Sequence, residues 1–210
     1  MNSDLTNPTI PVAKKEPHEM TIHGDTRVDN YYWMKLSDEQ KNAEVPDKQT
    51  QEVLNYLNEE NKYTSESLKH LDGFREKLFN EIVGRIKQTD MSVPYFKNGF
   101  YYLTRYEKGK EYPIYSRRKD ALTNPEQILL NVNELAEGYD YYNASSLNVS
   151  PDNKILGYGE DNVSRRIYTL RFKDLESGKM LDDVIPNTTG SLTWGNDNST
   201  IFYTLSLIHI

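Results

Sequence analysis

The residues of this chain that could carry chemistry do not assemble into a complete active site. The Gly-x-Ser-x-Gly turn that holds a hydrolytic serine is absent, and neither Gly109-Lys110 nor Gly178-Lys179 sits in a phosphate-binding loop. His18 and His23 are five residues apart and share no face of a helix or strand, so they predict no metal pair. Adjacent carboxylates such as Asp182-Asp183 point apart and are expected on a solvated face. The sequence therefore predicts no catalytic residue, no metal site and no cofactor within its 210 residues.

Two adjacent arginines, Arg165 and Arg166, follow Asp161 closely. A guanidinium group can bind a carboxylate ligand, or it can pair with a carboxylate of the protein itself. Because ion pairs at protein surfaces are common, we favour a structural pair with Asp161 or between structural repeats. Contact with a ligand is the alternative.

Two similar segments, 146–158 and 191–203, share the order Ser-Leu, a large apolar residue, Asp-Asn, an aliphatic residue and Tyr. In each, one predicted strand enters a polar turn and a second strand leaves it; the turns are Asp152-Asn153 and Asp197-Asn198. Asp197 follows Asp152 by 45 residues, and short-strand repeats of about 40–50 residues are typical of propeller blades. Two unrelated hairpins in an ordinary β domain are the alternative.

The spacing of apolar residues changes from helical to strand-like near residue 89. Helices are predicted from Asp47 or Lys48 to Leu68 and from Asp72 to about Gln88. The second helix has the stronger apolar stripe, formed by Leu71, Phe74, Leu78, Ile82 and Ile86. Strands are predicted at 93–97, 100–106, 112–118, 128–131 and 166–173, with one helical turn at 132–136.

These elements predict a division into 1–88, an arm followed by helices, and 89–204, the first blades of a propeller. Tyr31, Tyr32 and Trp33 form an aromatic cluster that should dock on an apolar partner distant in sequence. Two blades cannot close a ring, so a truncated chain is expected. The last residues, 205–210, are apolar and lack the expected turn; we interpret them as a tail foreign to the natural protein, with a true edge strand as the alternative.

The composition of the sequence argues against some classes of binding partner and indicates where in the cell the protein is expected. The formal net charge of −7 argues against sequence-independent binding of nucleic acid. No run of 18 apolar residues is present, so no membrane span is predicted. Residues 1–20 are polar and lack the apolar core of a secretory signal, so a cytoplasmic location is expected. With no Cys, the chain has neither disulfides nor Cys-based metal sites.

The segment His23-Gly24-Asp25-Thr26-Arg27-Val28-Asp29-Asn30-Tyr31-Tyr32-Trp33 resembles the N-terminal signature of the oligopeptidase B (protease II) family, serine peptidases of the prolyl oligopeptidase type. The resemblance extends from about residue 17 to 204. It continues through Pro94-Tyr95 and the segments 109–115, 150–153, 160–161, 164–166 and 194–197.

The resemblance implies a mainly β fold with an N-terminal helical segment, in which a seven-bladed β-propeller precedes a C-terminal α/β-hydrolase domain that this chain lacks. It implies a peptidase that hydrolyses short basic peptides after Arg or Lys, with the propeller limiting substrate size. The family's serine, histidine and aspartate follow the propeller, so no catalytic residue is transferred and the chain alone is expected to be inactive. The chain's own hydrolase domain would be the docking partner of Arg27, Asp29, Tyr31, Tyr32 and Trp33.

Two other classes of function remain open from the residues alone. A non-enzymatic propeller that binds proteins would need more 45-residue copies downstream and no hydrolytic serine turn. A solute-binding or carbohydrate-active β protein, the weaker alternative, would need carboxylates that converge on a pocket.

Overall fold

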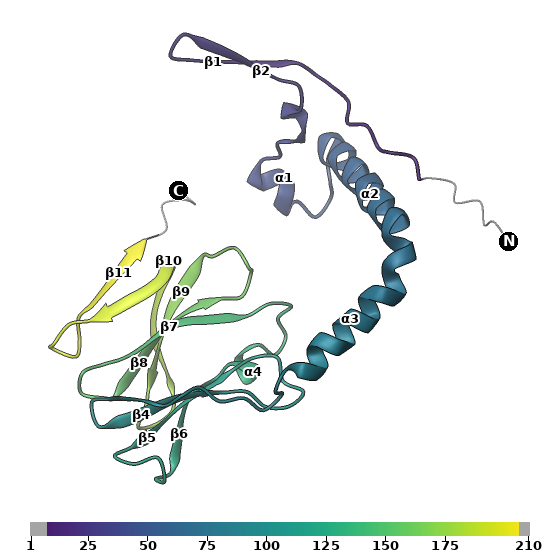
Figure 1. Cartoon of the computed structure of the whole chain (residues 1–210). Coiled ribbons are helices and arrows are strands. Elements are labelled where there is room, and N and C mark those ends of the chain that lie inside the picture. The colour runs from purple at the N-terminus through teal and green to yellow at the C-terminus, as the bar shows by residue number, and fades with distance from the viewer. Residues whose placement is uncertain (1–7, 206–210) are drawn as a thin grey trace. The chain divides into compact units, whose positions relative to one another are not determined.

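The computed structural model describes residues 8–205, and its contacts divide the chain into two units, Met1–Arg85 and Ile86–Ile210 (Figure 1). The first unit is helical apart from one hairpin, and the second is built almost entirely of strands. No helix among residues 8–205 has the length and apolar character needed to cross a membrane. Of the predicted tail, only Leu205 lies within the described residues, and it ends the last strand.

The first unit begins with a hairpin that the sequence did not predict. Its elements are β1 (His18–Ile22), β2 (Asp25–Asp29), the 3₁₀ helix η1 (Tyr32–Met34), α1 (Asp38–Asn42), α2 (Lys48–Leu68), the 3₁₀ helix η2 (Lys69–Leu71) and α3 (Asp72–Arg85). β1 and β2 are antiparallel, and the turn residues His23 and Gly24 have φ of 53° and 82°. The two strands are largely exposed, so they lack the alternation of apolar and polar residues that would have revealed them.

The predicted limits of the first long helix are confirmed. Asp47 caps α2, because its Oδ1 accepts a hydrogen bond from the backbone N–H of Thr50 at 2.7 Å. α1 begins with a capping box, in which Ser37 and Gln40 each accept a hydrogen bond from the other's backbone N–H. α3 ends at Arg85, about three residues before the predicted end.

The second unit contains two antiparallel sheets in which each strand pairs with the next in sequence. The four-stranded sheet holds β3 (Tyr95–Lys97), β4 (Phe100–Arg105), β5 (Ile114–Lys119) and β6 (Glu126–Asn131), and a short helix, α4 (Val132–Leu135), follows it. The five-stranded sheet holds β7 (Asn143–Val149), β8 (Ile155–Asp161), β9 (Tyr168–Asp174), β10 (Met180–Trp194) and β11 (Ile201–Leu205). Sequential antiparallel order within each sheet is the arrangement of propeller blades.

The core of this unit lies where the two sheets meet. One buried cluster combines Tyr102 of β4 and Leu130 of β6 with Leu156 and Tyr158 of β8. A second cluster, formed by Leu170, Phe172 and Leu192, joins β9 to β10. The sheets therefore pack against each other through apolar side chains, as neighbouring blades do.

β10 is a 15-residue strand that serves two partners. Its first part pairs with β9 and its second part pairs with β11, and the register shifts near Thr188. Gly190, with φ of 84°, lies at this bend. The first part was not predicted as a strand, because its exposed polar residues and Pro186 interrupt the apolar pattern.

Candidate functional site

The aromatic cluster of the first unit has partners within that unit. Trp33 packs edge-on against Tyr56 of α2, with ring centroids 6.3 Å apart, and its Nε1 donates to the backbone oxygen of Lys14 at 3.0 Å. Tyr32 stacks on His18, with centroids 3.9 Å apart. The structure therefore adds partners within the unit that were not predicted, and docking of the cluster on a segment distant in sequence stays a prediction. Tyr56 of α2 was not predicted from the sequence as a partner of Trp33.

The other residues predicted to dock have local contacts as well. Arg27 is exposed, and its Nε lies 3.1 Å from Oδ2 of Asp25. Oδ1 of Asp29 accepts the backbone N–H of Tyr31 at 2.8 Å, which holds the chain as it leaves β2. The side chain of Tyr31 is 42% exposed. These contacts shape the segment and leave the Arg27 and Tyr31 side chains open to a further partner.

Helices α2 and α3 present large apolar side chains to solvent. On α3, Phe74 is 63% exposed and Ile82 is 52% exposed, and the helix contains no buried residue. The exposed apolar residues of the two helices are Leu54, Leu57, Leu68, Phe74, Leu78, Phe79 and Ile82. An apolar surface of this extent normally marks an interaction site, so α3 is the main candidate docking surface of the first unit.

The two predicted Asp-Asn pairs occupy the turns β7–β8 and β10–β11. Asn153 and Asn198 have left-handed backbones, with φ of 65° and 63°. Oδ1 of Asp152 accepts hydrogen bonds from the Ser150 hydroxyl at 2.7 Å and from the backbone N–H of Lys154 at 3.2 Å. Oδ1 of Asp197 accepts the backbone N–H groups of Ser199 and Thr200 at 3.1 and 2.9 Å. The aspartates thus close the turns by satisfying local donors.

The hydrogen bonds of the Asp197 turn affect the pKa of this aspartate. Donation from the Thr200 hydroxyl, followed by the backbone N–H groups of Thr200 and Ser199, lowers the pKa of Asp197 to about 2. Because this pKa lies below the unfolded value of about 3.9, the carboxylate stabilises the turn above that value, and the contribution is lost as the pH falls toward 2. Thr200→Val should raise the pKa of Asp197 toward its ordinary value in an NMR titration.

A second acidic turn is the control for this titration. Asp174 has its pKa lowered chiefly by the Ser177 side chain, and Thr200→Val should leave it unchanged. An unaltered pKa of Asp197 in the variant would contradict the assigned cause.

Arg165 and Arg166 lie in the loop between β8 and β9, and both side chains are exposed. Asp161 is buried, and its carboxylate accepts the backbone N–H groups of Val163, Ser164 and Arg166 at 3.0, 2.9 and 2.9 Å. Among residues 8–205, neither arginine forms a salt bridge with Asp161. The predicted pair with Asp161 is therefore not formed, because backbone donors already satisfy that carboxylate, and a pair between structural repeats stays a prediction. Ligand contact by the two arginines stays a prediction.

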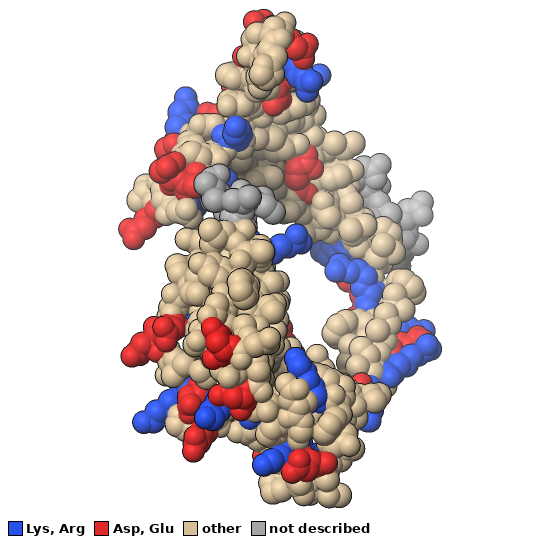
Figure 2. Space-filling model, turned by 90° about the vertical axis from the view of Figure 1, so that its left-hand side faces the viewer, with Lys and Arg blue, Asp and Glu red and all other residues tan. Residues whose placement is uncertain are grey.

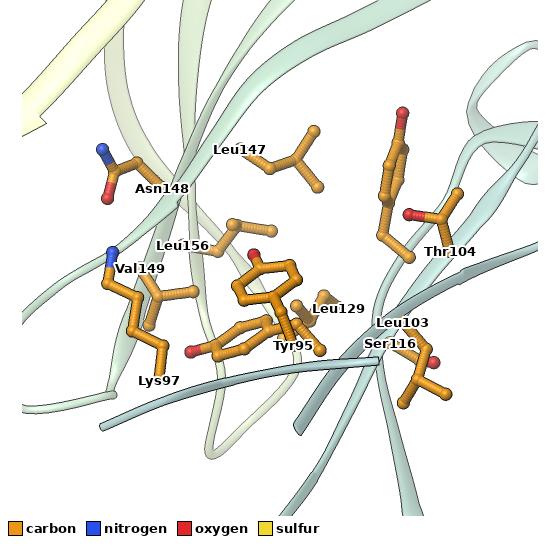
Figure 3. Close-up of a pocket in the computed structure, with 12 residues that line it drawn as sticks. Tyr95, Lys97, Leu103, Thr104, Ser116, Leu129, Leu147, Asn148, Val149 and Leu156 are labelled. Carbon is orange, nitrogen blue, oxygen red and sulfur yellow. The ribbon is translucent and has the colours of Figure 1, made fainter. Parts of the chain in front are cut away.

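A small cavity lies between the two sheets of the second unit (Figure 3). Its volume is about 60 Å³, enough for one or two water molecules. Tyr95, Lys97 and Leu129 line it from one sheet, and Asn148 and Leu156 line it from the other. The lining residues include no nucleophile beside a general base, so the cavity is a packing gap and has no arrangement for catalysis.

Two features of the surface of the described residues bear on ligand binding, namely its charge and the groups that could hold a metal ion. Acidic and basic side chains are interspersed over the face shown in Figure 2, with wide areas between them that carry neither. Among residues 8–205, no group of three or more metal-ligating His, Asp or Glu side chains is close enough to hold an ion. What the geometry of residues 8–205 offers is a scaffold with an exposed apolar helix.

The chain is similar to known peptidases along nearly its whole length. The family model described as prolyl oligopeptidase, N-terminal beta-propeller domain, matches residues 11–206. The chain is 41% identical to dipeptidyl aminopeptidase BI of Pseudoxanthomonas mexicana and 36% identical to protease 2 of Moraxella lacunata. Each match covers 93% of this chain and 28% of the relative.

Solved structures agree with these relatives. Oligopeptidase B from Leishmania major matches with a TM-score of 0.80 and 27% identity, over 93% of this chain and 29% of that one. Oligopeptidase B from Trypanosoma brucei, with covalently bound antipain, matches with a TM-score of 0.77 and 27% identity, over 92% of this chain and 28% of that one. The predicted fold class, a helical segment followed by the first blades of a propeller, is confirmed by these matches.

Proposed function

The chain belongs to the prolyl oligopeptidase family, through the N-terminal β-propeller domain, and from this membership we propose that it is the docking segment and first blades of a serine peptidase. The observation that carries the proposal is the share of its relatives' length that this chain covers. The chain spans about 28% of the curated relatives' length, and the residues that line its cavity include no nucleophile beside a general base. The catalytic serine, histidine and aspartate would lie in a hydrolase domain encoded after residue 210.

The proposed reaction is hydrolysis of short peptides after Arg or Lys. The resemblance of residues 23–33 to the oligopeptidase B signature supports this specificity, and the matches to protease 2 and to oligopeptidase B support the coarser assignment to a peptidase family. The propeller would limit the size of substrates by steric exclusion. A second candidate is removal of dipeptides from the amino end of a peptide, favoured by the 41% identity to a protein named dipeptidyl aminopeptidase BI.

The product of the full reading frame distinguishes these activities. It should be offered short fluorogenic peptides with Arg, Lys, Pro or Ala before the reporter, each with a free or a blocked amino terminus. The proposal predicts that kcat/KM for Arg and Lys exceeds that for Pro and Ala at least tenfold, with blocked peptides accepted. A strict need for a free amino terminus would favour dipeptide removal instead, and hydrolysis of none of the peptides would overturn both candidates.

Docking of the first unit is proposed to use the apolar stripe of α3 together with Arg27, Asp29, Tyr31, Tyr32 and Trp33. Ile82, on this stripe, is 52% exposed in the chain described here. Ile82→Asp should lower the stability of the full-length protein by about 3 kcal/mol, because an unpaired charge would be buried at the interface. In the 210-residue chain alone the same change should alter stability by less than about 0.5 kcal/mol.

The matched control is Lys77→Asp, a charge change on the exposed polar side of the same helix. It should affect neither protein by more than about 0.5 kcal/mol. Urea denaturation of both proteins gives the comparison. Equal effects of Ile82→Asp on the full-length protein and the 210-residue chain would show that α3 has no partner outside residues 1–210.

A further inference from the structure

Three hairpins of the second unit turn at an asparagine with a left-handed backbone. They are the β3–β4, β7–β8 and β10–β11 hairpins, and their residues Asn98, Asn153 and Asn198 have φ of 48°, 65° and 63°. We call the three turns that contain these residues the asparagine turns. Only the last two belong to the repeat found in the sequence, since Asn98 is followed by Gly99 and lacks the preceding Asp.

The asparagine turns are hydrogen-bonded to one another. Nδ2 of Asn153 donates to the backbone oxygen of Asn98 at 3.3 Å, which links the five-stranded sheet to the four-stranded one. Oδ1 of Asn198 accepts the backbone N–H of Asp152 at 2.8 Å, which links the β10–β11 turn to the β7–β8 turn. In both links, the side chain of the later asparagine reaches the backbone of the preceding turn.

The chemistry of the side chain explains why asparagine suits these positions. A left-handed backbone is inexpensive for Gly and Asn, but Gly has no side chain to reach the neighbouring turn. The amide group offers a donor, as Asn153 uses it, and an acceptor, as Asn198 uses it. Asp would supply only an acceptor when ionised. The link at position 153 therefore needs the amide donor of asparagine, whereas the link at position 198 needs only an acceptor on a residue that tolerates a left-handed backbone.

Further contacts hold the same turns in place. Arg117 of β5 is only 3% exposed, and its Nη2 donates to the backbone oxygen of Asn153 at 2.9 Å. Its guanidinium lies 4.0 Å from the ring centroid of Phe100, and its Nε donates to Oε1 of Gln127 at 2.7 Å. These contacts fix the arginine against the four-stranded sheet. The Asn153 turn is thus held from its neighbours on both sides.

A second pair of bonds runs alongside the later link. Nδ2 of Asn148 donates to the backbone oxygen of Leu192 at 3.2 Å, and Nε1 of Trp194 donates to the backbone oxygen of Asn148 at 3.0 Å. β7 and the second part of β10 are therefore joined reciprocally by side chains, without a β ladder between them. Apolar packing alone does not specify how such strands slide past each other, whereas directional hydrogen bonds do.

We propose that the asparagine turns form a latch between successive hairpins, in which the side chains of Asn153 and Asn198 each reach back to the preceding turn and set the register of one hairpin against the next. The inference concerns the assembly of the propeller and does not depend on the proposed peptidase activity. The link to be measured is the hydrogen bond from the backbone N–H of Asp152 to Oδ1 of Asn198.

Hydrogen exchange in the full-length protein tests the latch, read at the Asp152 amide by fragmentation mass spectrometry. Asn198→Gly keeps the left-handed turn and removes the acceptor, so exchange of the Asp152 amide should rise about tenfold. The control is Asn187→Gly, because Asn187 also has a left-handed backbone, with φ of 60°, and is exposed on β10. That variant should leave the Asp152 amide unchanged.

Asn198→Asp is the complementary variant, and it remains informative if Asn198→Gly does not fold. It retains a side-chain oxygen that can accept from Asp152, so protection of that amide should persist. Unchanged exchange at Asp152 in Asn198→Gly, or an equal rise in Asn187→Gly, would overturn the latch. Loss of protection in Asn198→Asp would overturn it as well.

Discussion

Gly159→Ala is expected to cost the second unit about 3 kcal/mol or more, because β8 and β10 approach each other at this residue with no room for a side chain. A Cβ atom on Gly159 would lie 2.7 Å from Cα of Gly190 and 2.8 Å from its backbone oxygen. Both obstacles are backbone atoms, so a flexible side chain cannot yield to relieve the clash. Gly190 is constrained in turn, since its own Cβ would lie 2.7 Å from the ring of Tyr168.

Urea denaturation of the variant measures this cost, and Gly84→Ala in α3 is the matched control. A Cβ atom on Gly84 meets no atom within 4 Å, and the residue lies inside a helix. Alanine should therefore stabilise the first unit by up to about 1 kcal/mol through its higher helix propensity. If Gly159→Ala unfolded at the same urea concentration as the unsubstituted protein, the close approach of β8 and β10 would be refuted.

The sequence predicted those elements whose local signals are strong. α2 begins at its Asp47 cap and ends at Leu68 as predicted, because a capping carboxylate and a helical apolar stripe are local features. The Asp-Asn pairs lie between strands because their left-handed turns are also determined locally. These features need no knowledge of distant contacts.

The features that escaped prediction depend on contacts between distant residues. The first part of β10 is held by pairing with β9 and not by its own apolar pattern. Trp33 packs against Tyr56, 23 positions later in the chain. The carboxylate of Asp161 accepts hydrogen bonds from loop backbone N–H groups and does not pair with a guanidinium. The links among the asparagine turns likewise join residues about 45 to 55 positions apart. Periodicity and residue type carry no signal for such pairings.

The same contrast between local signals and distant contacts applies to the candidate docking surface on α3. The apolar stripe of α3 was recognised from its spacing, and the structure leaves its side chains exposed. Docking of the stripe on the hydrolase domain is a proposal, because an apolar stripe indicates that a partner covers it without specifying which one. Membership of the prolyl oligopeptidase family came from the match over residues 11–206 and not from the geometry of any single site.

Covalent labelling with a fluorophosphonate, a reagent that reacts with activated serines, tests the central claim most directly. The product of the full reading frame and the 210-residue chain should be treated in parallel and digested, and the labelled peptide identified by mass spectrometry. We predict stoichiometric labelling of one serine encoded after residue 210, loss of peptidase activity on labelling, and no label on the 210-residue chain. A label on a serine within residues 8–205, or peptide hydrolysis by the 210-residue chain alone, would contradict the account.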